Sequence, residues 1–158
     1  MRAFTTALTL GVMLAAAATE VAGQGTNPRA GTWHLNVAKS KYSPGPAPKS
    51  QTLVITATGN SETVTSETVS ASGDKSSTVY TAAYDGKPQP IKGSQVADSV
   101  SLKRIDDHTS ERTDSKDGKA VQTYTRVVSK DGKTMTVTVK GTNAQGQPVN
   151  NVIVFEKH

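Results

Sequence analysis

The chain of 158 residues carries a formal net charge of +5 and has no cysteine, which excludes disulfide bonds, thiol catalysis and cysteine-ligated metals. Its length suits one domain, and because only 4% of its residues are aromatic we expect a thin or partly polar core. Its lysines are scattered over turns and strand ends and do not gather with aromatic residues, which argues against a nucleic-acid partner.

Residues 1–23 have the pattern of a secretory signal peptide. Arg2 gives a short positive region, residues 7–18 are apolar, and the small residues at 21–23 offer a cleavage site, with 16–18 as second choice. The apolar run is too short to span a membrane. We therefore expect an exported protein, periplasmic or extracellular, and the lack of cysteine fits a bacterial envelope.

Residues 24–30 are expected to be a flexible, polar lead-in, and 31–158 to form a single β-domain. The first strand is predicted over 31–37, where Trp33 shares one face with the apolar residues two and four positions later.

The stretch that follows, 39–50, is rich in proline, which excludes a central strand and favours an extended surface path. This stretch is interpreted as a crossover loop, and a lid over an opening is the alternative.

Short segments of alternating apolar and polar residues then continue to the C-terminus, each with the period of two that is typical of a strand. The pattern is clearest in 120–130 and 134–140, which are joined around Asp131-Gly132, a strong signal for a type I′ hairpin turn. Segment 62–71 alternates weakly and is expected to be an edge or poorly packed strand, whereas 109–116 is polar throughout. Further strands are predicted over 51–58, 76–84, 88–93, 99–105 and 149–156.

These elements predict an all-β fold, an antiparallel up-and-down meander of about eight to ten strands with almost no helix. Closure into a barrel is favoured because it removes exposed sheet edges. A Greek-key sandwich is the alternative, but it needs long crossing connections, and only the proline-rich stretch is long enough. A membrane-spanning barrel is rejected because the outer faces carry Thr, Ser and Lys in place of an apolar band.

Gly31-Thr32-Trp33 resembles the Gly-x-Trp at the start of the first strand in lipocalins and fatty-acid-binding proteins, the calycin group. Segments 31–41 and 127–147 resemble more closely a set of small exported bacterial proteins, called lipocalin-like, that have no assigned activity. The resemblance implies a lipocalin-like or fatty-acid-binding-protein-like barrel that is closed at one end by Trp33 and holds a small, largely apolar ligand. The helical lid of the fatty-acid-binding proteins is replaced here by the proline-rich stretch.

Tyr80, Tyr84, Tyr124 and Arg126 are the candidate ligand-binding residues. Tyr124 and Arg126 are two apart and share a strand face, on which a guanidinium suits a carboxylate and a tyrosine hydroxyl can share that load. Fatty-acid-binding proteins use a similar pair on a late strand. The alternative is that Arg126 faces solvent or pairs with an acidic residue of a neighbouring strand, and that the odd-numbered residues of 121–127 face inward.

Tyr80 and Tyr84 share a face on which a ligand could lie across both rings, and core filling is the alternative. Arg104, with Gly31 and Trp33, is a candidate for the structure of the barrel end. It is predicted to be an interior cation, a cation–π cap on Trp33 as in the lipocalin group, or an exposed charge at a strand end.

His34, His108 and His158 are far apart and show no metal-ligand spacing, so no metal or cofactor is expected. The sequence also has no Gly-x-Ser-x-Gly nucleophile turn. We predict a non-enzymatic, monomeric, exported barrel that binds a small hydrophobic or amphipathic ligand. If an arginine lies in the interior, it would favour an anionic ligand. The alternatives are an envelope module with a filled barrel or sandwich that binds a protein or glycan, and a small barrel enzyme.

Overall fold

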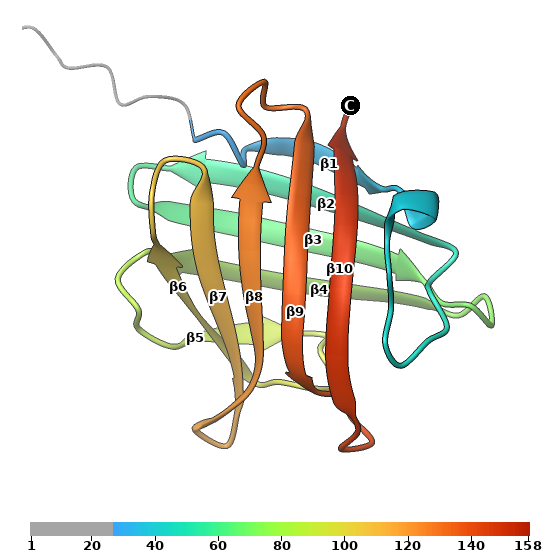
Figure 1. Cartoon of the computed structure of the whole chain (residues 1–158). Helices are drawn as coiled ribbons and strands as arrows, with labels where there is room; N and C mark the ends of the chain where they lie inside the picture. The colour runs from blue at the N-terminus through green and yellow to red at the C-terminus, as the bar shows by residue number, and fades with distance from the viewer. Residues whose placement is uncertain (1–26) are drawn as a thin grey trace, which may run out of the picture.

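A computed structural model describes residues 27–158, which form one closed barrel of antiparallel strands (Figure 1). The predicted signal peptide, 1–23, and residues 24–26 of the lead-in lie outside the described residues. The strands, in chain order, are β1 (Gly31–Leu35), β2 (Ser50–Thr58), β3 (Ser61–Val69), β4 (Lys75–Ala83), β5 (Gln89–Lys92), β6 (Ser99–Arg104), β7 (Thr109–Lys116), β8 (Lys119–Val128), β9 (Thr134–Thr142) and β10 (Pro148–Lys157).

Each strand pairs with its neighbours in sequence, and β1 closes the barrel by pairing with both β2 and β10. Trp33, for example, lies opposite Leu53 of β2 and Lys157 of β10. The predicted all-β up-and-down barrel is confirmed, and the sandwich alternative is wrong. The one helical element in residues 27–158 is a single 3₁₀ turn, Val37–Lys39, and none of these residues forms a helix long and apolar enough to cross a membrane.

Two strands differ from their sequence-based description. Segment 62–71 is predicted to be an edge or poorly packed strand, but β3 is no edge, because it pairs along its whole length with β2 on one side and β4 on the other. Its packing is thin, since only Glu62 and Val64 are buried. The polar segment Thr109–Lys116 is strand β7, in which Ser110 and Asp114 are buried. Alternation is hidden in β7 because the side chains that face inward are polar, as are those that face solvent.

The hairpin between β8 and β9 is also wider than predicted. Residues 129–133 connect the strands, and Gly132 alone of the Asp131-Gly132 pair has a positive φ, of 71°. The two-residue turn with positive φ at both positions lies between β7 and β8, at Asp117 (50°) and Gly118 (75°).

Because the strands alternate in direction, their connections gather at two ends of the barrel (Figure 1). We call the end that holds residues 27–30, the start of β1 and the β8–β9 turn the closed end. We call the opposite end, which holds the proline-rich stretch and the β3–β4 and β9–β10 turns, the open end. The proline-rich stretch is held there by β10, since Lys41 forms a bridge to Val152 and the Ser43 amide donates to Asn151 Oδ1 at 2.8 Å.

The barrel interior is partly polar, as the low aromatic content predicts. Its apolar core includes Trp33 and Leu102, both 0% exposed, together with Ile55, Met135 and Phe155. Among these apolar side chains lie six buried polar residues, Arg29, Glu62, Ser110, Asp114, Gln122 and Arg126. These buried polar groups lead to the candidate site.

Candidate ligand-binding cavity

A cavity of about 200 Å³ lies inside the barrel. Apolar side chains form much of its wall: Leu53, Ile55, Val64, Ile91, Val96, Met135, Val137, Ile153 and Phe155. Tyr80, Arg112, Asp114, Tyr124 and Arg126 add a strongly polar sector. This combination of apolar walls and a few convergent polar groups is typical of small-molecule sites in proteins.

The inward face of β8 carries Gln122, Tyr124, Arg126 and Val128, so the alternative in which the odd-numbered residues of 121–127 face inward is wrong. Val127 is 42% exposed, whereas Arg126 is only 5% exposed. Tyr124 and Arg126 therefore share the interior, as one of the two sequence interpretations required.

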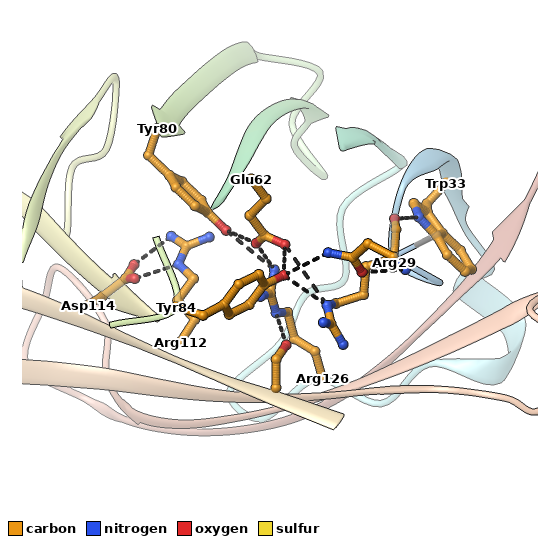
Figure 2. A network of polar contacts seen from close by, with 10 residues as sticks. Arg29, Trp33, Glu62, Tyr80, Tyr84, Arg112, Asp114 and Arg126 are labelled. Atoms are coloured by element: carbon orange, nitrogen blue, oxygen red, sulfur yellow. Dashed lines mark hydrogen bonds and ion pairs between the residues drawn. The ribbon is translucent and has the colours of Figure 1, made fainter. Parts of the chain in front are cut away.

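Arg126 is paired, but with a partner that neither interpretation named. Its Nη1 donates to Glu62 Oε1 at 2.5 Å, and its Nε donates to Ser110 Oγ at 3.0 Å (Figure 2). Glu62 is on β3 and Arg126 is on β8, and in the closed order of strands these two are five steps apart in either direction. The ion pair, which we call the cross-barrel pair, therefore joins opposite walls.

Glu62 is the centre of the polar network. Its carboxylate accepts hydrogen bonds from the hydroxyls of Tyr84 and Tyr80, the second at 3.2 Å, while Arg29 Nε lies 3.9 Å from Oε2 (Figure 2). Burial raises the pKa of this carboxyl, but the Arg126 charge, the hydrogen bonds from Tyr84 and Arg126, and the Arg29 charge outweigh burial and hold the pKa below its usual range. Glu62 is therefore an ionised acceptor at neutral pH.

This pKa predicts a loss of stability in acid. Because Glu62 has a lower pKa in the folded protein than its ordinary value of 4.5, the unfolded chain takes up the proton first as the pH falls. The stabilisation is complete above about pH 5 and disappears as the pH falls through the folded-state pKa. Urea unfolding measured from pH 7 to pH 3 should show this loss in the wild type, and a Glu62→Gln variant should lack this component. Equal pH dependence in both proteins would contradict the assignment.

Arg112 and Asp114 form a second polar group on β7. The Arg112 guanidinium donates to both Asp114 oxygens, at 2.6 and 2.8 Å, and lies over the rings of Tyr80 and Tyr124, 4.7 and 4.6 Å from their centroids. Burial raises the pKa of Tyr80 to about 12 and also raises the pKa of Tyr124, so both hydroxyls stay protonated donors.

Tyr84 lies elsewhere than expected. It does not line the cavity, and its hydroxyl sits at the closed end, where it donates to Glu62 and accepts from Arg29 Nε at 3.0 Å. Arg104 is exposed at the end of β6 and lies over the Tyr84 ring, 4.8 Å from its centroid. The cation over Trp33 is Lys157, at 4.7 Å.

The lead-in contributes directly to the closed end. Arg29 was assigned to a flexible segment, but its side chain is 0% exposed inside the barrel. Trp33 Nε1 donates to the Arg29 carbonyl at 2.8 Å, and Lys157 Nζ donates to the carbonyls of Pro28 and Ala30. Gly31 allows this route with a φ of +132°, a conformation that residues with a Cβ rarely adopt.

Several buried donors in the interior have no partner among the described residues: Arg29 Nη1 and Nη2, and Arg126 Nη2. The interior also carries an excess of positive charge, since Arg29, Arg112 and Arg126 face two carboxylates, Glu62 and Asp114. Three positive charges against two negative charges leave one positive charge, and buried unpaired donors are unfavourable. An anion bound inside the barrel would accept hydrogen bonds from these donors and would neutralise the excess positive charge.

The cavity opens toward a larger hollow of about 610 Å³ at the open end, which we call the mouth. The two spaces share Gln51, Thr68, Tyr124 and Ile153 as lining residues. The prolines at 44, 46 and 48 line the mouth but not the cavity. The proline-rich stretch thus forms part of the rim of the opening.

The structure therefore brings Tyr80, Tyr124 and Arg126 together at the cavity and places Tyr84, Gly31, Trp33 and Arg104 at the closed end. Sequence reasoning missed Arg29, Glu62, Arg112 and Asp114. For Arg112 and Asp114 the only signal was their spacing, because they lie two apart in a segment between two turns. This spacing could have been recognised as one polar face of a strand.

No protein-family model matches this chain, and no curated protein matches it. Function must therefore be argued from the geometry. The described residues 27–158 include no cluster of three or more His, Asp or Glu that could hold a metal ion. They do bring His34 and His158 into edge contact, with ring centroids 4.7 Å apart, although these residues lie near opposite ends of the β-domain sequence.

Proposed function

We propose that this protein is an exported, non-enzymatic, lipocalin-like barrel that binds a small amphipathic anion. The observation that carries the proposal is the 200 Å³ cavity, which has apolar walls and an arginine, Arg126, whose Nη2 has no partner among the described residues. The resemblance around Gly31-Thr32-Trp33 and the signal-peptide pattern support the family and the export, respectively.

The size of the cavity limits the ligand. An apolar cavity of roughly 150 Å³ is enough to hold benzene, so 200 Å³ suits a short alkyl chain or one ring with a small head group. A longer chain would extend into the mouth.

The charge of the interior favours an anion over a neutral ligand. Arg126 keeps one donor nitrogen, Nη2, without a partner among residues 27–158, while Nη1 and Nε donate to Glu62 and Ser110. A carboxylate that accepts from Nη2 would also offset the excess positive charge. Hydrogen bonds to charged groups contribute roughly 1.5–3 kcal/mol, which corresponds to about a 10- to 100-fold difference in affinity.

An envelope module with a filled barrel is the weaker candidate because the interior holds open space. A catalytic role is also less well supported. Glu62 and Asp114, the carboxylates near the cavity, accept charged hydrogen bonds from arginines, which occupies the oxygens that a general base would need.

The test begins with native mass spectrometry of the full chain, exported and processed by its expression host. An added mass that is lost on denaturation would identify a resident ligand. Titration with octanoate and with its neutral analogue octanamide then tests the charge preference, and we expect octanoate to bind about 10-fold or more tightly. Equal affinity for the two would contradict an anion site.

The matched variant is the double substitution Glu62→Gln with Arg126→Gln. Removing both partners of a buried pair disturbs a fold much less than removing one, so this variant should fold. We expect it to bind octanoate and octanamide with similar affinity. A preference for octanoate that survives in the double variant would assign the head group to another residue.

A further inference from the structure

The mouth differs chemically from the cavity below it. Arg112, Asp114 and Arg126 line the cavity, whereas none of the described residues that line the mouth carries a charge. The mouth is lined by amides, hydroxyls, prolines and aliphatic side chains. A ligand that reaches from one space into the other therefore meets ionic chemistry at its inner end and neutral chemistry at its outer end.

The amides of the mouth offer both donors and acceptors. Asn151 uses Oδ1 to accept from the Ser43 amide at 2.8 Å, and its Nδ2 is the donor half of the same group. Gln51 uses Nε2 to donate to Ser66 Oγ at 2.9 Å, and its Oε1 is the acceptor half. A ligand hydroxyl, which both donates and accepts, matches such a pair.

Tyr42 adds a further hydroxyl to the mouth. It lies in the proline-rich stretch and lines the mouth, and its Oη is buried without a hydrogen-bond partner among the described residues. Burial also raises its pKa to about 12, so the group is a protonated donor. An unpaired buried hydroxyl is unfavourable, and a polar ligand group next to it would remove that cost.

The rim of the mouth also presents flat apolar surfaces. The rings of Tyr42 and Tyr124 and the prolines at 44, 46 and 48 all belong to its lining. Hydroxylated carbon skeletons have polar edges and C–H faces, which suits a lining that contains hydroxyls and amides together with rings.

We propose that the mouth is a second subsite that binds an uncharged, hydroxyl-bearing group at the outer end of the ligand. This inference rests on the proposed function, because the inner end of the same ligand is the anion held at Arg126. The ligand class is then a short-chain acid that carries a neutral hydroxylated group at its far end.

Three eight-carbon probes test this subsite. They are octanoate, 8-hydroxyoctanoate and octanedioate, which share the inner carboxylate and differ at the outer end as methyl, hydroxyl and second carboxylate. By isothermal titration calorimetry we expect 8-hydroxyoctanoate to bind at least about 3-fold more tightly than octanoate, the size of one net hydrogen bond. Octanedioate should bind no more tightly than octanoate, because the described part of the mouth offers no positive charge to its second carboxylate.

Two variants locate the effect. Tyr42→Phe removes only the unpaired hydroxyl, and Asn151→Ala removes both the donor and the acceptor of the side-chain amide. Both should bind octanoate as the wild type does and should lose the preference for 8-hydroxyoctanoate. Asn150→Ala, on the exposed face of the same strand, is the matched control and should retain the preference.

The outcomes separate the two proposals. If octanoate binds and 8-hydroxyoctanoate binds no better, the mouth subsite is overturned and the proposed function stands. If the preference persists in Tyr42→Phe and Asn151→Ala, the subsite is also overturned. If octanoate does not bind the wild type, the proposed function fails and the subsite fails with it.

Discussion

Replacing Glu62 with alanine is expected to lower the free energy of unfolding by about 3–5 kcal/mol, because removal of one partner leaves buried charge without compensation. Glu62 is 1% exposed and is the carboxylate closest to both Arg126 and Arg29. A domain of this size is typically stable by only about 5–15 kcal/mol. Urea unfolding at pH 7, followed by far-ultraviolet circular dichroism, measures the change.

Glu67→Ala is the matched control, since Glu67 belongs to the same strand, β3, and is exposed. It should change the free energy of unfolding by no more than about 0.5 kcal/mol. If Glu62→Ala fails to fold, the double variant Glu62→Gln with Arg126→Gln should restore folding. A Glu62→Ala protein as stable as the Glu67→Ala protein would contradict a buried cross-barrel pair.

Replacing Trp33 with alanine should lower the free energy of unfolding by a similar amount, about 3–5 kcal/mol, which is the range for large aromatic residues truncated in a core. Trp33 is 0% exposed, donates to the Arg29 carbonyl and lies under the Lys157 ammonium. Its loss would remove packing at the closed end and release the segment 27–30 at the same time.

Circular dichroism must again be the probe, because Trp33 is the only tryptophan and its loss removes the fluorescence signal. Val54→Ala, at a position 44% exposed on the adjacent strand β2, is the control and should change stability by less than about 1 kcal/mol. Trp33→Phe keeps much of the ring packing but loses the Nε1 donor. Its loss of stability should lie between those of Trp33→Ala and Val54→Ala. A Trp33→Ala cost no larger than that of Val54→Ala would show that Trp33 does not hold the closed end.

The fold was predictable because its determinants are local. Alternation and turn residues can be recognised within ten residues, and the meander follows when each hairpin joins neighbours in sequence. The one strand that escaped recognition, β7, is polar on both faces, and two of its inward side chains, Arg112 and Asp114, belong to the polar sector of the cavity. The alternation of apolar and polar residues is weak in β7 because the part of the interior that this strand faces is itself polar.

The site was only partly predictable because its partners are distant in sequence. The spacing of Tyr124 and Arg126 correctly grouped them on one face, but the choice of the inward face depended on Glu62, 64 residues earlier and on the opposite wall. Glu62 sits in a segment of Thr, Ser and Val whose alternation is weak, so nothing local marks it as buried. Arg29 lies outside any periodic segment, and its burial depends on contacts with Trp33 and Tyr84.

The cross-barrel pair also bears on how quickly and how tightly a ligand is bound. A thin-cored barrel with an empty interior tends to collapse inward, but a 2.5 Å ion pair between β3 and β8 fixes the separation of opposite walls before any ligand arrives. The cavity is thus preorganised, and binding does not have to supply the energy for opening it. The rate of association would then be set by passage through the mouth and past the proline-rich rim. For octanoate, which makes no polar contact in the mouth, changes in that rim should alter the on-rate and the off-rate together while leaving the affinity nearly constant.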